Sequence, residues 1–215
     1  MGFVKYKEKE NQIVVKAYGD DGKFIKSFFI PSKLYPLSYD NYKIFESSNT
    51  LEIKDEDILN LINTVKFKLA HCYTMSEMLL DTLKDYNIKS YSGWFFIGGQ
   101  VPIFHSWCVL DDKYLIDLSN DHETITGYIK ENYSEFSRDI YAKVSRLFMN
   151  MKNTDRIAHI GKVGEDFFYI GCEDIPNNAR KTFRNLKKAY PNHESDLSVG
   201  GVGTLSPIQM EIMKN

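Results

Sequence analysis

Short runs of apolar and polar residues alternate near the start of the chain, which is the pattern of β-strands. Two such runs, QIVVKAY and KFIKSFFI, fill most of residues 12–30 and flank the turn sequence GDDG at 19–22. This arrangement predicts a β-hairpin, because Gly and Asp favour the tight turn that joins two antiparallel strands. The following residues, 31–54, contain Pro31 and Pro36 and are expected to be irregular.

Further along, the apolar residues recur every three or four positions, which is the spacing of one face of a helix. Residues 55–70 (DEDILNLINTVKFKLA) begin with acidic residues and predict one helix, and residues 72–86 (CYTMSEMLLDTLKDY) predict a second. We also expect a helix over residues 133–152 and a basic helix over residues 177–189.

Strand patterns follow the second helix directly. Residues 90–97, 102–110 and 113–118 are three strand candidates, and the run EDFFYIG at 165–171 predicts another strand. The order helix, helix, strand, strand, strand predicts an α+β fold in which helices pack on an antiparallel sheet.

We expect one domain over residues 1–215, because no clear linker divides the chain and its length is sufficient to bury a large core. Its parts are a hairpin and irregular segment at 1–54, a central α+β core at 55–120, a helical and strand extension at 121–195, and a Gly-rich tail at 196–215. The tail is expected to be mobile.

Composition and charge argue against several classes of protein. Hydrophobic residues make up 43% of the chain and charged residues 26%, as in folded globular proteins. The net charge is −2, and the candidates for a basic patch are weak, such as residues 180–188, which suit a solvated helix face, so no nucleic-acid partner is expected. The first residues lack the apolar core of a signal peptide, and no apolar run approaches a membrane span, so no membrane partner is expected.

The three cysteines are an odd and small number, which indicates reduced thiols and a cytoplasmic protein. There is no CxxC pair and no cluster of His and Cys, so we expect no metal and no cofactor. Nothing in the sequence indicates an oligomeric state.

Candidate chemistry lies in the central segment. Cys72 opens the second predicted helix, while His105 and Asp117 lie on two consecutive predicted strands. A thiol is a weak nucleophile at neutral pH, and both a helix N-terminus and an imidazole within about 4 Å favour its thiolate form. The imidazole in turn needs an acceptor at its second nitrogen to fix its tautomer, and Asp117 is a candidate for that acceptor.

Strand geometry limits which of these side chains meet. Because side chains alternate along a strand, we expect His105, Trp107 and Val109 on one face and Cys108 on the other. Cys108 is therefore the poorer nucleophile candidate. Whether Asp117 lies on the same face as His105 depends on the register of the two strands, which the pattern leaves open.

The run from Cys72 to Asp117 resembles the transglutaminase-like core of the papain-like Cys-His-Asp superfamily, over about residues 69–119. The matching features are a cysteine that opens a helix, the strand-ending pair Gly93 and Trp94, the triplet HSW at 105–107, and the run DDKYLIDLS at 111–119. Two positions depart from the family pattern, because Asn87 and His71 stand where small residues are usual.

The resemblance implies a papain-like/transglutaminase-like core and a triad in which Cys72 is the nucleophile, His105 the general base and acid, and Asp117 the group that orients the ring. Cys72 would attack the carbonyl of an amide in a protein, peptide or small molecule, forming a thioester that an amine or water then resolves. The backbone N–H of Cys72 would donate to the oxyanion. The calcium-dependent members need acidic metal loops, and this chain has none, so the resemblance adds no metal.

Other residues are weaker candidates. Trp94, Trp107 and Gln100 are candidates for substrate binding, although core packing for the two tryptophans and a simple turn for Gln100 are the alternatives. The remaining histidines have no evident partner in the sequence and are assigned to structure or surface: His71, His122, His159 and His193. Cys172 is assigned to structure.

Two other functions stay open. An arylamine N-acetyltransferase-like enzyme, which uses acetyl-CoA, shares the Cys-His-Asp order, but that family usually has an Arg-Gly-Gly run before its cysteine. This chain has KFKLAHC there and is also short for the family. A non-catalytic binding module on the same scaffold is the third possibility, and the intact set of Cys72, His105 and Asp117 argues against it.

Overall fold

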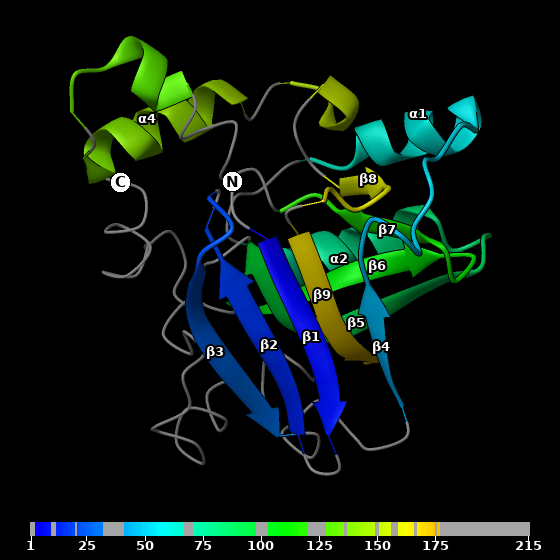
Figure 1. The fold of residues 1–215 in the computed structure, drawn as a ribbon. Coiled ribbons are helices and arrows are strands. Elements are labelled where there is room, and N and C mark those ends of the chain that lie inside the picture. The colour runs from blue at the N-terminus through cyan, green and yellow to red at the C-terminus, as the bar shows by residue number, and fades with distance from the viewer. Residues whose placement is uncertain are drawn as a thin grey trace.

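The structure is a computed structural model of the chain. It describes residues 3–9, 12–19, 21–31, 41–66, 71–97, 103–119, 128–135, 137–148, 151–155, 159–165, 167–174 and 176. Helices and two antiparallel sheets build the described part, which confirms the predicted α+β class (Figure 1). No helix in these ranges is both long enough and apolar enough to cross a membrane.

The smaller sheet has three strands in the order β1-β2-β3, with bounds β1 (Phe3–Lys9), β2 (Gln12–Tyr18) and β3 (Phe24–Pro31). The pair β2–β3 confirms the predicted hairpin. Gly22 in its turn has a φ of 73°, a conformation that a residue without Cβ adopts at little cost. Strand β1 is an element that the sequence pattern does not predict.

The larger sheet has six strands in the order β4-β9-β5-β6-β7-β8. Their bounds are β4 (Tyr42–Phe45), β5 (Ile88–Ile97), β6 (Ile103–Leu110), β7 (Tyr114–Asp117), β8 (His159–Gly161) and β9 (Phe167–Glu173). The paired strands β5, β6 and β7 and the strand β9 confirm four predicted strands. The expectation that 31–54 is wholly irregular is wrong, because β4 pairs with β9 along its whole length.

The helices include α1 (Glu56–Thr64), α2 (Cys72–Thr82) and α4 (Arg138–Phe148), residues 128–132 are helical as well, and Asn153–Asp155 form a 3₁₀ turn. Three predicted helices are thereby confirmed with shorter bounds than expected. Helix α1 starts where Asp55 caps it, accepting hydrogen bonds from the amides of Asp57 and Ile58 at 3.0 and 3.2 Å. The helix predicted at 177–189 and the tail at 196–215 lie outside the described residues.

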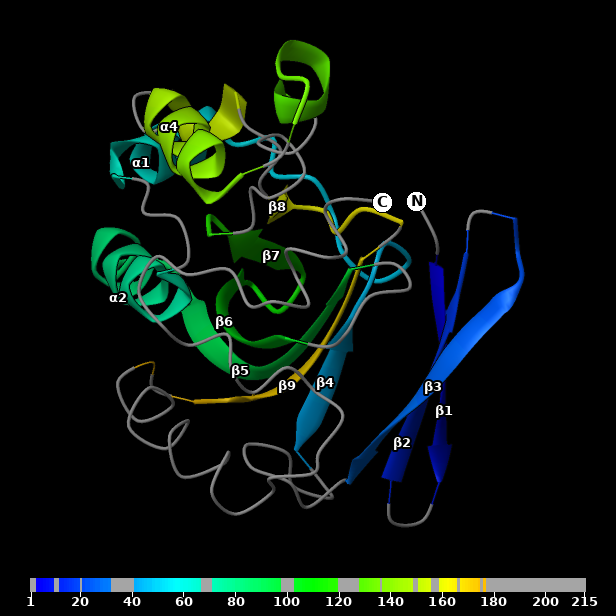
Figure 2. The same cartoon turned by 90° about the vertical axis from the view of Figure 1, so that its left-hand side faces the viewer.

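The two sheets pack face to face, and Figure 2 shows them as separate layers. Ile13, Val15 and Ala17 of β2 point into a core cluster with Trp94 and Phe168 of the larger sheet. These three small-sheet residues are at most 1% exposed. The alternation of apolar and polar residues along β2 therefore buries one face of the hairpin against the larger sheet.

Helices α1 and α2 pack on the larger sheet through a second core cluster. Ile62 of α1 and Leu79 of α2 meet Cys108 of β6 and Ile116 of β7 there. The contact packs the Leu79 side of α2 against the face of β6 that carries Cys108, which is opposite to the face that carries Trp107. Figure 2 shows α2 outside the curve of the sheet, beside β5 and β6.

The larger sheet is strongly curled. The Tyr169 hydroxyl of β9 donates a 2.8 Å hydrogen bond to Asp117 of β7, although β5 and β6 lie between these strands. In a flat sheet the two strands would be about 14 Å apart, so only a curled sheet brings the two side chains together. The inner face of this curve holds an aromatic cluster that includes Phe95, Trp107 and Tyr169.

Candidate active site

The turn between β6 and β7 sets the register that the sequence left open. Asp111 and Asp112 both have positive φ, at 53° and 57°, and the pairing that follows places Val109 opposite Leu115. Opposite residues point to the same face of a sheet. Asp117, two residues beyond Leu115, therefore points to the same inner face as His105.

His105 and Asp117 are joined directly. The Nε2 atom of His105 lies 2.7 Å from the Oδ2 atom of Asp117. The His105 residue is 8% exposed and Asp117 is 2% exposed, so the pair is almost entirely out of solvent. Charge-assisted hydrogen bonds of this length are the strong ones, and burial removes the competition from water.

The Asp117 carboxylate is saturated with hydrogen bonds. Its Oδ2 atom accepts from His105 and Tyr169, and its Oδ1 atom accepts from the amide and hydroxyl of Ser119 at 3.1 and 2.8 Å. Burial alone would raise the pKa of Asp117, but the His105 charge and its hydrogen bond, followed by the charge of His159 and the Ser119 bond, lower that pKa to about 2. Asp117 is therefore a carboxylate throughout the physiological range.

Cys72 approaches the other side of the ring. Its side chain interacts with His105 both through charge and through a hydrogen bond. Because Asp117 and Ser119 occupy the Nε2 side of the ring, Nδ1 is the nitrogen that faces Cys72. Cys72 is partly exposed, whereas His105 and Asp117 are buried, so the thiol is the member of the trio that solvent reaches.

His105 is held in its charged form. Burial disfavours the charge and lowers the pKa of the ring, but the charges of Asp117 and Cys72 and the hydrogen bonds to both outweigh burial and raise that pKa to about 10. The ring lies between aromatic neighbours, with its centroid 5.3 Å from that of Phe95 and 6.4 Å from that of Trp107. The structure thus brings Cys72, His105 and Asp117 together in one array.

Helix α2 positions Cys72 because its first turns are fixed to β6. The hydroxyls of Ser76 and Ser106 lie 3.2 Å apart, and the Cys108 thiol donates a 3.5 Å hydrogen bond to the Ser76 carbonyl. Cys108 is fully buried on the α2 side of the sheet, as its predicted face requires. Burial raises the pKa of the Cys108 thiol, so this cysteine is held as an inert thiol.

His159 and Tyr169 are parts of this site that sequence reasoning misses. The Nδ1 atom of His159 lies 2.7 Å from the Tyr169 hydroxyl, which in turn donates to Asp117. The sequence assigns His159 to structure or surface for want of a partner, and the structure supplies that partner. The available signal is Tyr169 itself, since a tyrosine within a buried strand needs a hydrogen-bond partner for its hydroxyl.

The three residues predicted to bind substrate are Trp94, Trp107 and Gln100. Trp94 and Trp107 are 0% and 1% exposed and sit in two different core clusters, so neither presents a surface to a substrate. Both tryptophans are therefore core residues, which is the alternative that the sequence offered. Gln100 lies outside the described residues. Cys172 is buried in the core between the two sheets, in agreement with its assignment to structure.

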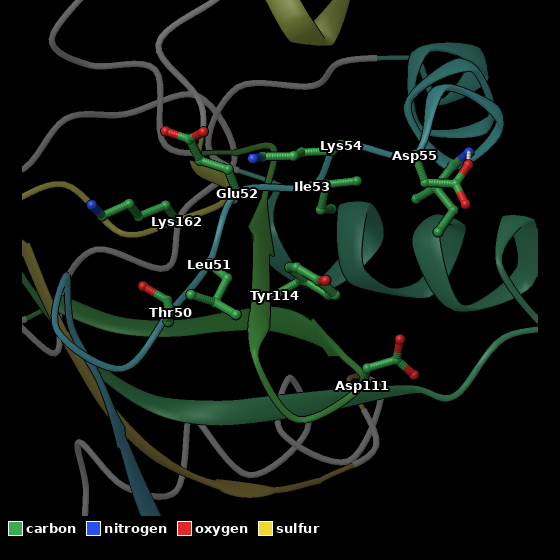
Figure 3. Close-up of a pocket in the computed structure, with 10 residues that line it drawn as sticks. Thr50, Leu51, Glu52, Ile53, Lys54, Asp55, Asp111, Tyr114 and Lys162 are labelled. Atoms are coloured by element: carbon green, nitrogen blue, oxygen red, sulfur yellow. Dashed lines mark hydrogen bonds between the residues drawn. The ribbon is translucent and has the colours of Figure 1, made fainter.

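A separate pocket of about 640 Å³ lies near the β6–β7 turn (Figure 3). Its lining mixes both signs of charge, with Glu52 and Asp111 among the acids and Lys54 and Lys162 among the bases. Asp111 is six residues from His105 along the strand, which is about 20 Å at 3.3 Å per residue. None of Cys72, His105 and Asp117 lines this pocket.

Within the described ranges, no group of three or more His, Cys, Asp or Glu side chains has the arrangement of a metal site. Comparisons of the chain with protein-family models, with curated proteins and with solved structures gave no significant match. The interpretation of the site therefore rests on its geometry.

Proposed function

We propose that this protein is a cysteine-nucleophile enzyme of transglutaminase-like type, which transfers or hydrolyses the acyl group of an amide in a protein or peptide. The observation that carries the proposal is the array in which the partly exposed Cys72, at the start of α2, adjoins the buried and hydrogen-bonded pair His105–Asp117. An exposed nucleophile, a base behind it and a carboxylate behind the base are the parts that covalent acyl transfer needs.

In the acylation step, the Cys72 sulfur attacks the carbonyl carbon of the amide and a C–S bond forms. The charge that develops on the carbonyl oxygen is stabilised by the Cys72 backbone N–H at the N-terminus of α2. His105 then transfers its Nδ1 proton to the amide nitrogen, the C–N bond breaks, and the amine or ammonia leaves. The product of this step is a thioester on Cys72.

In the deacylation step, water or an amine attacks the thioester carbonyl and His105 accepts the proton of the attacking group at Nδ1. The C–S bond breaks and the Cys72 sulfur leaves as a thiolate beside the imidazolium. Asp117 keeps Nε2 protonated and the ring in one orientation through both steps, which its saturated carboxylate suits. Water gives hydrolysis or deamidation, and an amine gives transamidation.

Two finer assignments belong to the same proposal. We place the protein in the cytoplasm, where thiols stay reduced, because its cysteines Cys72, Cys108 and Cys172 are all free. We assign the core around α2, β5, β6 and β7 to the papain-like type, because a helix that opens with a cysteine packs on the strands that carry the histidine and the aspartate.

The test uses an activated acyl donor, because the natural substrate is unknown. Purified full-length protein is mixed with a p-nitrophenyl ester, p-nitrophenol release is followed, and the acylated residue is mapped by peptide mass spectrometry. We expect a burst of p-nitrophenol with the acyl group on Cys72, and a slower burst in the His105→Ala variant. Acylation spread over lysines, or a burst unchanged by His105→Ala, would overturn the proposal.

The substrate class then follows from two further assays on the same protein. Release of ammonia from glutamine-containing peptides tests deamidation, and incorporation of a primary amine into them tests transamidation. Turnover of acetyl-CoA with an arylamine tests the acetyltransferase alternative. The Cys72→Ala variant is the matched control in each assay, because it retains the fold and removes the nucleophile.

A further inference from the structure

A second buried histidine lies behind the proposed triad. His159 of β8 is 5% exposed and Tyr169 of β9 is 0% exposed, and the two are hydrogen-bonded at 2.7 Å. The Tyr169 hydroxyl also contacts Asp117 at 2.8 Å. The four side chains His159, Tyr169, Asp117 and His105 therefore form one continuous hydrogen-bonded chain across the inner face of the sheet.

The direction of each hydrogen bond in this chain follows from counting protons. Asp117 is an acceptor only, so the single proton of the Tyr169 hydroxyl must point to Asp117. The Tyr169 oxygen is then an acceptor toward His159, and the Nδ1 atom of His159 must carry a proton. The reverse arrangement would place two oxygens without a proton 2.8 Å apart in a buried site.

Electrostatics agrees with this assignment. Burial lowers the pKa of His159; the charge of Asp117 opposes this and that of His105 adds to it, leaving the pKa at about 4. His159 is therefore neutral at neutral pH, with its proton on Nδ1. One buried carboxylate thus faces two histidines, of which only His105 is charged.

We propose that Tyr169 is a positioning residue of the site, which holds the Asp117 carboxylate in place for His105, and that neutral His159 fixes the Tyr169 hydroxyl in the orientation this requires. The titratable groups that act on this pair are Asp117 of β7 and His105 of β6, and Cys72 of α2 in turn contacts His105. The catalytic meaning of this chain rests on the function proposed above, whereas its effect on the charge of His105 does not.

The physical reason is the cost of a buried charge. Asp117 is 2% exposed and depends on four hydrogen bonds, one of which comes from Tyr169. If that donor is removed, the carboxylate loses one stabilising hydrogen bond and becomes more basic, so it holds the His105 proton more strongly and the pKa of His105 rises. The Tyr169→Phe variant keeps the ring that packs against Phe95 at 4.4 Å and removes only the hydroxyl.

The experiment measures the charge of His105 directly by NMR of its ring nitrogens over a pH series. We expect Tyr169→Phe to raise the pH at which His105 loses its charge by about one pH unit, the effect of one charge-assisted hydrogen bond. The matched control is Tyr91→Phe, which removes a hydroxyl from the same aromatic cluster but from a ring whose hydroxyl lies beside Lys43. That control should titrate as the wild type does.

His159 is tested separately, which also covers the case in which Tyr169→Phe does not fold. Asn can place an amide donor where Nδ1 lies, so His159→Asn should leave the titration of His105 close to wild type. His159→Leu removes the donor and should shift it in the same direction as Tyr169→Phe, by a smaller amount. A His105 titration that none of these substitutions moves would overturn the inference.

A second readout separates this inference from the proposed function. The rate at which iodoacetamide labels Cys72 at pH 7 should fall several-fold in Tyr169→Phe, because an Asp117 carboxylate that is held less firmly positions the charged His105 ring less well beside the reactive thiolate. A thiol that is labelled quickly and depends on His105, but is unaffected by Tyr169→Phe, would sink the positioning role alone. A thiol that is unreactive in the wild type, beside a His105 titration that Tyr169→Phe does move, would sink the proposed function alone.

Discussion

His105 of β6 and Asp117 of β7 are hydrogen-bonded at 2.7 Å on the inner face of a curled sheet, and both are nearly inaccessible to solvent. Twelve residues of sequence separate them, and the β6–β7 turn brings them together. The pair holds one positive and one negative charge in the core, which is costly unless the charges stay paired. Several measurable consequences follow from this pairing.

The pairing predicts how stability depends on alkaline pH. The pKa of His105 is raised to about 10 from an ordinary value of 6.5, so its contribution to stability is complete below pH 6.5 and is lost as the pH rises toward 10. The free energy of unfolding, measured with urea at about pH 6.5, 8 and 9.5, should therefore fall over this range. In His105→Gln the fall should be clearly smaller, and an equal fall in both proteins would contradict the pairing.

Acid should destabilise the fold through different groups. The neutral His159 has a pKa lowered to about 4 from 6.5, so the unfolded chain binds an extra proton between these values and stability falls as the pH drops through them. Asp117, with a pKa lowered to about 2 from 3.8, adds a loss at still lower pH. The His159→Asn variant should lose less stability than the wild type between pH 6.5 and 4, as urea unfolding at each pH would show.

Gly93 is predicted to be irreplaceable for packing reasons. A Cβ at this position would lie 2.0 Å from the Ile170 carbonyl oxygen and 2.5 Å from the Gly171 Cα, so the β5–β9 pairing would have to move. Gly93→Ala should cost about 3 kcal/mol of unfolding free energy, the upper part of the range for overpacked cores. Gly22→Ala meets no atom within 4 Å and should cost only about 1 kcal/mol through its positive φ.

The two tryptophans should behave as core residues. Trp94 lies between the two sheets, and its truncation in Trp94→Ala should cost about 3–5 kcal/mol, as measured by urea unfolding. Trp94→Phe should reduce stability less and leave the iodoacetamide labelling of Cys72 unchanged, because Trp94 and His105 lie on opposite faces of the sheet. A selective loss of labelling in the folded Trp94→Phe protein would contradict a purely structural role.

Local patterns along the chain are sufficient to predict much of the fold. One face of QIVVKAY and one face of the helix that carries Ile58 and Ile62 pack against the core. Burial of one face requires apolar residues at regular intervals, and this spacing can be read within each segment. Strand β1 escapes prediction because its exposed residues alternate little. Strand β4 is not predicted because it has only four residues between irregular segments. Its partner β9 lies far away in the sequence, so no local pattern marks the pairing.

The site likewise has residues that the sequence predicts and residues that it does not. Cys72, His105 and Asp117 lie within one contiguous segment, where helix start, strand alternation and a turn can be predicted from the sequence. Tyr169 and His159 reach the site only because β9 lies beside β5 and β8 beside β7, a strand order that is not sequential. The burial of Trp107 likewise depends on the curl of the sheet, which no local pattern encodes.

The central claim is that His105 activates Cys72, and the reactivity of the thiol tests it most directly. The full-length protein and its His105→Ala variant are treated with iodoacetamide from about pH 5 to 9, and labelling of Cys72, Cys108 and Cys172 is followed by peptide mass spectrometry. We expect Cys72 to be labelled much faster than the two buried cysteines in the wild type, with a rate at pH 7 that falls about tenfold or more in His105→Ala. Labelling of Cys72 no faster than that of Cys108 and Cys172, with no change in His105→Ala, would contradict the account.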